Sequence, residues 1–65
     1  MTADELKAEI KKLTFRGMEA KMALHDLSEE LPTDWQKIPE TAQTAFEAFK
    51  ALAEARKQLK ALESA

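Results

Sequence analysis

The chain has 65 residues, a net charge of −2 at neutral pH and no cysteine, which leaves room for one small domain without disulfides or thiolate metal clusters. Twelve alanines and eight leucines but no valine make a composition typical of helices. The near balance of charges excludes a long-range field toward nucleic acid or an anionic membrane. Since a core of this size supplies only about 3–5 kcal/mol, we expect the chain to associate with further copies of itself.

The first predicted helix spans residues 2–31. Thr2 and Glu5 are spaced as in a capping box, in which each side chain accepts a hydrogen bond from the backbone amide of the other residue. Pro32 ends the helix, because it lacks an amide hydrogen and disfavours helical backbone angles at the residue before it.

Apolar or small residues recur along this helix in alternating steps of four and three. Such a heptad seam predicts packing against other helices, as in a coiled coil or a four-helix bundle. The seam consists of Leu6, Ile10, Leu13, Gly17, Ala20, Leu24, Leu27 and Leu31.

A second stripe on the same helix lies well away from the seam and consists of Phe15, Met18, Met22 and His25; we name it the outer stripe. Exposed Met and Phe side chains in a row are typical of a surface that recognises a partner protein. The alternative is that the outer stripe packs one bundle against another in a tetramer or forms a shoulder of the core.

The predicted connection covers residues 32–38. Thr33 and Asp34 offer a second helix cap, and one short helical turn is expected after them. Trp35 is a candidate binding residue, since Trp is frequent at binding hot spots. Its alternative role is to plug the open end of a bundle.

The second predicted helix spans residues 39–63, with Pro39 favoured as its first residue. Its seam consists of Ala45, Ala48, Leu52, Ala55, Leu59 and Leu62, and an adjacent apolar row consists of Ala42, Phe46, Phe49 and Ala53. An apolar face of this width contacts two neighbouring helices, as in a four-helix bundle.

Residues 1–65 are therefore predicted to form one all-α domain, an antiparallel two-helix hairpin that dimerises into a four-helix bundle, with a dimer of dimers as a further possibility. Gly17 and Ala20 indicate a close approach of helices, filled by Phe46 or Phe49 from across the bundle. The predicted core and dimer contacts are Leu6, Ile10, Leu13, Gly17, Ala20, Leu24, Leu27, Leu31, Ala45, Phe46, Phe49, Leu52 and Leu59.

The residues give little chemistry for catalysis. There is one histidine, no glycine-rich phosphate loop and no serine in the context of a nucleophile, so we expect no enzyme activity and no cofactor. His25, next to Asp26, is a weak candidate metal ligand, because the Glu-x-x-His pairs of di-iron bundles are absent. A surface histidine is the favoured interpretation, with no metal site.

The basic residues of the first helix are Lys7, Lys11, Lys12, Arg16 and Lys21. Glutamates interrupt them, whereas an RNA-binding stripe is continuous, so a solvated face is favoured. The chain also lacks the pattern of a secretory signal and any uncharged run near 20 residues. We expect a cytoplasmic protein that binds no membrane.

Residues 21–35 read KMALHDLSEELPTDW and residues 38–42 read IPETA. These runs resemble a family of small Rop-like proteins associated with nitrogen-fixation genes in bacteria. The resemblance implies helical hairpins that pair into four-helix bundles, with a role in nitrogenase maturation, protection or regulation. It singles out Met22, Leu24, His25, Asp26, Leu27, Leu31, Pro32, Trp35 and Pro39.

Two functions follow as alternatives. The favoured one is an accessory protein that binds a nitrogenase-related protein through Phe15, Met18, Met22, His25, Asp26 and Trp35. The other is RNA binding, as in Rop-like bundles of the plasmid type, which bind paired RNA hairpins. The acidic balance and the interrupted basic residues argue against RNA.

Overall fold

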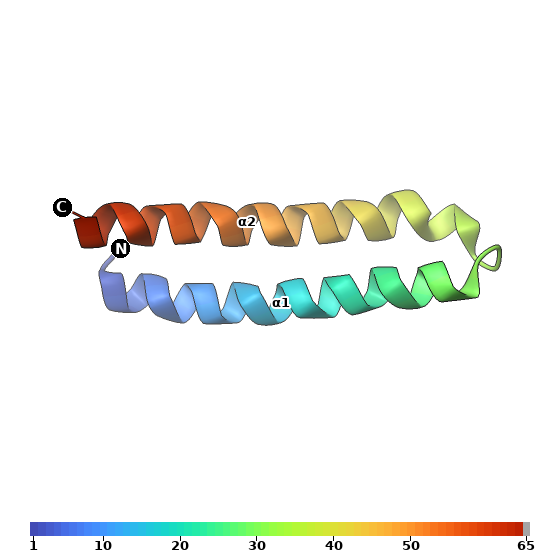
Figure 1. Ribbon diagram of the computed structural model, residues 1–65, viewed down its shortest axis with the longest axis horizontal. Helices are drawn as coiled ribbons and strands as arrows, with labels where there is room; N and C mark the ends of the chain where they lie inside the picture. Colours follow the sequence, from blue (N-terminus) through green and yellow to red (C-terminus); the bar gives the residue numbers. More distant parts are fainter. Residues whose placement is uncertain (65) are drawn as a thin grey trace.

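The protein is a hairpin of two long antiparallel helices (Figure 1). A computed structural model describes residues 1–64, in which α1 spans Ala3–Glu30, the short 3-10 turn η1 spans Trp35–Lys37 and α2 spans Ile38–Ser64. These residues contain no β-strand, so the predicted all-α hairpin is confirmed. Each helix boundary lies within one residue of its predicted position. The molecule is a rod of 49 × 15 × 14 Å, with both termini at the end opposite the loop.

The first turn of α1 carries the predicted capping box. The Glu5 amide donates to the Thr2 hydroxyl at 3.1 Å, and the Thr2 amide donates to the Glu5 carboxylate at 3.1 Å. The bond from the Thr2 amide, followed by the contact with the Thr2 hydroxyl, holds the pKa of the Glu5 carboxyl below its usual value. These bonds satisfy amides that have no partner within the helix.

The connection turns sharply after α1. Leu31, which precedes Pro32, leaves the helical region with ψ 142°, as the proline ring requires. The predicted short turn is present as η1, whereas the predicted side-chain cap is wrong. Asp34 adopts a left-handed conformation with φ 59° and makes no capping bond; its carboxylate lies 3.9 Å from the Lys37 amine. An Asp residue tolerates this conformation better than most.

The buried core lies in the half of the rod that holds the termini. It consists of Leu6, Leu13, Leu52 and Ala55, with Ile10 and Leu59 packed against it while partly exposed. Ala20 and Ala45 are buried further toward the loop. Burying these leucines and the adjoining apolar surface is the main force that holds the two helices together.

Gly17 lies directly against the ring of Phe49 from α2. A Cβ atom added there would lie 3.2 Å from Cε1 of Phe49, tighter than an ordinary van der Waals contact. Phe49 thus fills the space over Gly17, as one of the two predicted phenylalanines was expected to do. It comes from α2 of the same chain, and it remains 44% exposed.

The half of the rod near the loop is open. The single hairpin leaves four predicted core residues exposed, namely Leu24, Leu31, Phe46 and Phe49, and a second copy would have to bury them. The reason lies in α2, whose seam in this half holds only the small residues Ala45 and Ala48, with Thr41 one turn before them. Trp35 is 60% exposed, so the single hairpin does not enclose it as a plug.

Candidate functional site

The outer stripe holds the most exposed large apolar side chains of α1. Phe15, Met18 and Met22 are 64%, 58% and 62% exposed. Because an α-helix turns by about 100° per residue, the stripe lies on the side of α1 that faces away from the buried seam. The seam residues Leu6 and Leu13 are packed against α2, so the hairpin itself offers nothing to cover the stripe.

Two open hollows follow the outer stripe. One lies beside Phe15 and Met18 and is lined by Ala8, Lys11, Lys12, Thr14, Phe15, Arg16, Met18 and Glu19. The other is lined by Met18, Lys21, Met22 and His25. The structure therefore brings together four of the predicted binding residues: Phe15, Met18, Met22 and His25.

Basic side chains border these hollows. Lys11, Lys12, Arg16 and Lys21 line them, while Glu19 is the one acidic side chain that does so. Within residues 1–64 these four cations take part in no ion pair, in contrast to Lys7, whose amine lies 3.8 Å from a Glu63 carboxylate oxygen. Their charges are free to attract an acidic ligand.

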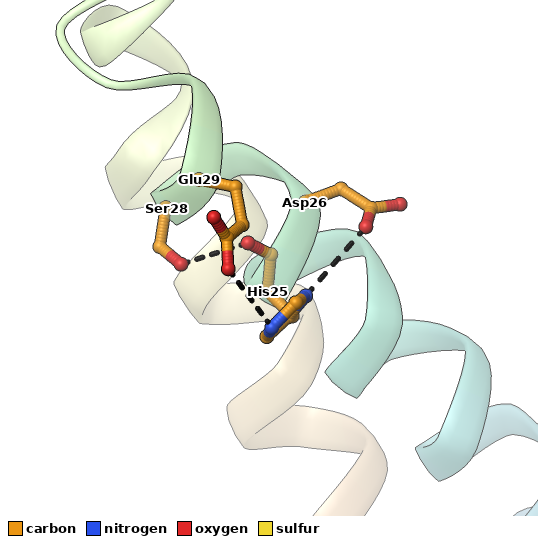
Figure 2. A network of polar contacts seen from close by, with 4 residues as sticks. All are labelled: His25, Asp26, Ser28 and Glu29. Atoms are coloured by element: carbon orange, nitrogen blue, oxygen red, sulfur yellow. Dashed lines mark hydrogen bonds and ion pairs between the residues drawn. The ribbon is translucent and has the colours of Figure 1, made fainter.

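His25, the last residue of the outer stripe, belongs to a small polar network (Figure 2). Its Nε2 atom lies 3.4 Å from Glu29, one helical turn later, and its Nδ1 atom lies 3.7 Å from Asp26. The Ser28 hydroxyl donates to the His25 carbonyl at 2.7 Å. All these contacts are within α1, and the carboxylates make this end of the stripe negative.

The network is not arranged as a metal centre. No group of three or more His, Asp or Glu side chains in residues 1–64 is placed to hold a metal ion. His25 and its two carboxylate neighbours are well exposed, so water competes for each contact. The arrangement suits a surface that binds by packing and charge.

Asp26 and Trp35 stand apart from the other predicted binding residues. Asp26 reaches the stripe only through its contact with His25. Trp35 lies in η1 at the loop end and lines neither hollow of the outer stripe. Each hairpin therefore presents two separate candidate surfaces, the stripe and the loop end.

A groove between the helices was not predicted from the sequence. It is lined by Leu13, Arg16, Glu19, Ala20, Ala23, Thr44, Glu47, Ala48 and Ala51. The small side chains of Ala20, Ala23, Ala48 and Ala51 leave this groove open. The signal in the sequence was the alanine content, which we interpreted as helix propensity and as a sign of close helix approach, but not as an open groove. Separately, neither helix within residues 1–64 holds a stretch long and apolar enough to cross a bilayer.

Comparison with known proteins gives the family. A model of the Rop-like family matches residues 1–64. A UPF0437 protein of Azorhizobium caulinodans is 59% identical over 61 residues, covering 94% of this chain and 88% of that protein. A UPF0437 protein of Trichormus variabilis is 44% identical over 62 residues, covering 95% of this chain and 72% of that protein.

A solved structure shows the same architecture. It is an NMR structure of a structural-genomics target, 46% identical in sequence, with a TM-score of 0.92 over 100% of this chain and 92% of that one. The hairpin geometry and the family match agree with each other and with the resemblance noted in the sequence. The chain belongs to the Rop-like family.

Proposed function

We propose that this protein is a non-enzymatic helical-bundle protein that pairs with a second copy of itself and binds a protein partner in nitrogenase maturation or regulation. The process is supported by the resemblance of residues 21–42 to Rop-like proteins associated with nitrogen-fixation genes. The mode of action is supported by the surface of α1. Neither support depends on the other.

The observation that carries the binding role is the exposure of the outer stripe. Phe15, Met18 and Met22 form a row of large apolar side chains on the face of α1 away from α2. Exposing such a row to water is unfavourable, and partner proteins commonly cover it. Met suits a surface of this kind because its unbranched side chain repacks against different shapes.

The pairing with a second copy is supported by a different set of side chains. Phe46 and Phe49 lie one turn apart on α2, and both are exposed, as is Leu24 on α1. Two helices have no enclosed interior, whereas four helices do. A second hairpin laid on this flank would bury these side chains and leave the outer stripe accessible.

Photo-crosslinking in nitrogen-fixing cells tests the binding role. A photoreactive phenylalanine analogue replaces Phe15, and the same analogue replaces Lys57 on α2 as the control. We expect a defined partner protein crosslinked at position 15, absent at position 57 and absent when Met18→Glu is added. Recovery of the same proteins at both positions would contradict the proposal.

Sedimentation equilibrium tests the pairing. We expect a dimer at micromolar concentration that dissociates more readily in a Phe46→Ala, Phe49→Ala variant. Phe15→Ala is the control, since it removes a phenylalanine about as exposed as Phe46 from the other surface. A folded monomer at micromolar concentration would overturn the four-helix bundle.

A further inference from the structure

We propose that the ligand of the outer stripe is an acidic amphipathic helix, presented by the partner protein. This inference rests on the proposed function and names the chemistry of the partner segment. It is carried by the spacing of the stripe, by the free cations beside it and by the opposite charge at its far end.

The spacing of the stripe matches a helix better than an extended peptide. Phe15, Met18, Met22 and His25 follow one another in steps of three, four and three, and Ala8 stands seven residues before Phe15. This is the period by which one helix packs against another at a shallow angle. Phe15 to Met22 spans about 10 Å at 1.5 Å per residue, which two turns of a partner helix cover with two or three apolar side chains.

The charges beside the stripe select an acidic helix. On the surface of α1, Lys12 and Lys21 lie on opposite sides of the outer stripe. Lys11 lies in line with the stripe, between Ala8 and Phe15. None of them is paired within residues 1–64. The chain as a whole carries a net charge of −2, so this positive region contrasts with the rest of the molecule. Glutamate or aspartate side chains on the flanks of a partner helix would face these cations.

The charges at the His25 end of the outer stripe determine the orientation of the partner helix. Asp26 and Glu29 surround His25, so acidic side chains are repelled there. The partner helix therefore carries its acidic residues beside the segment from Ala8 to Lys21. Beside His25 it is neutral or basic.

Two other ligands fit less well. RNA would contact a continuous row of cations, but here Phe15, Met18 and Met22 occupy the centre of the face and Glu19 interrupts its border. A membrane surface calls for a longer apolar face than three large side chains. RNA and membrane vesicles are both included as competing ligands in the experiment below.

Synthetic peptides of three heptads provide the probe. Both peptides carry Leu at the two seam positions of each heptad; one carries Glu on both flanks and the other carries Lys. Fluorescence anisotropy of the labelled peptides, with the full-length protein at low and at high salt, measures binding. We expect the acidic peptide to bind at least tenfold more tightly than the basic one, and to bind more weakly at high salt.

Variants of the protein assign this binding to the stripe. Lys12→Glu with Lys21→Glu reverses the flanking charge, and we expect it to abolish the preference for the acidic peptide. Lys50→Glu with Lys57→Glu on α2 makes the same change in net charge and is expected to keep the preference. Met18→Glu and Met22→Ala, which change exposed side chains and leave the hairpin folded by circular dichroism, are each expected to weaken binding at least fivefold.

Several outcomes would overturn the inference. Equal affinity for the two peptides would do so, as would unchanged binding of the acidic peptide by Met18→Glu. Tighter binding to a structured RNA or to phosphatidylserine vesicles, competing with the peptide, would assign the surface to that ligand. If the protein crosslinked at position 15 contacts it through a segment without acidic residues, this inference fails and the proposed function stands. If the acidic peptide binds the outer stripe but no partner protein is crosslinked in cells, the proposed function fails and the preference for an acidic helix stands.

Discussion

The two halves of the hairpin have the same heptad pattern in α1 but differ in what surrounds it. Near the termini Leu6 and Leu13 are buried against Leu52 and Ala55. Near the loop Leu24 and Leu31, on the same seam, remain exposed. The difference comes from α2, whose seam holds Leu52, Leu59 and Leu62 in one half and only Ala45 and Ala48 in the other.

This contrast shows that a regular seam on one helix does not decide its own burial. A leucine is covered only where the facing helix brings enough volume. The half near the termini holds the hairpin together, and the half near the loop leaves Leu24 and Leu31 exposed. Three variants test this contrast, and a fourth tests the cap at Thr2.

Leu52→Ala is expected to have the largest effect. Leu52 is 5% exposed, and removing a buried leucine side chain costs about 2–5 kcal/mol, most of what a chain of this size has. Urea denaturation followed by circular dichroism measures the free energy of unfolding. Leu62→Ala, the same change at an exposed position of α2, is expected to cost far less. Equal losses would mean that the core does not lie where the structure places it.

Leu24→Ala is expected to come next, with a cost that depends on protein concentration. Leu24 is 37% exposed in the single hairpin, so the change costs about 1 kcal/mol there. At concentrations where a second copy covers the loop half, the cost should rise. Denaturation at two protein concentrations measures this, and a cost as large as that of Leu52→Ala under dilute conditions would remove the contrast between the halves.

Gly17→Ala is expected to have a smaller effect, whose sign reports on pairing. Alanine in a helix is about 1 kcal/mol more favourable than glycine, but its methyl group would press on the Phe49 ring. In the single hairpin the ring can move outward, so the change should stabilise the protein. In a dimer that traps Phe49, it should destabilise it. We expect destabilisation at high concentration that disappears in a Phe49→Ala background; stabilisation at every concentration would contradict pairing on this flank.

The smallest effect concerns the pH dependence of the cap at Thr2. Because the folded pKa of Glu5 lies below its usual value, its contribution to stability is complete above the unfolded pKa. The contribution declines as the pH falls through the folded pKa. We expect the first turn of α1 to fray in acid, seen as faster amide hydrogen exchange there. Thr2→Ala removes the hydroxyl contact but keeps the backbone amide that donates to the Glu5 carboxylate, so the pKa of Glu5 should return only part of the way to its usual value. An unchanged titration would show that the hydroxyl does not contribute to the lowered pKa.

Local rules predicted most of the fold. The spacing of Thr2 and Glu5 predicted the cap, and Pro32 predicted the end of α1. The heptad spacing predicted which residues face α2 in the half near the termini. These features depend on residues close in sequence, or on a periodicity that one helix shows alone.

Features that depend on two distant segments were harder to predict. The exposure of Leu24 and Leu31 depends on which part of α2 lies opposite them, and the groove between the helices depends on alanines from both. For the candidate site, spacing predicted the outer stripe, whereas the separation of Trp35 from it followed only from the fold.

The rod shape of the hairpin, 49 × 15 × 14 Å, affects how the molecule moves in water. An elongated particle meets more friction than a sphere of equal mass, so a single hairpin elutes from a gel-filtration column like a heavier globular protein. A second copy laid side by side doubles the mass without adding length, and the particle becomes rounder. Elution volume therefore changes less than mass does, while rotation about the long axis slows considerably. Fluorescence anisotropy decay of Trp35 follows that rotation directly.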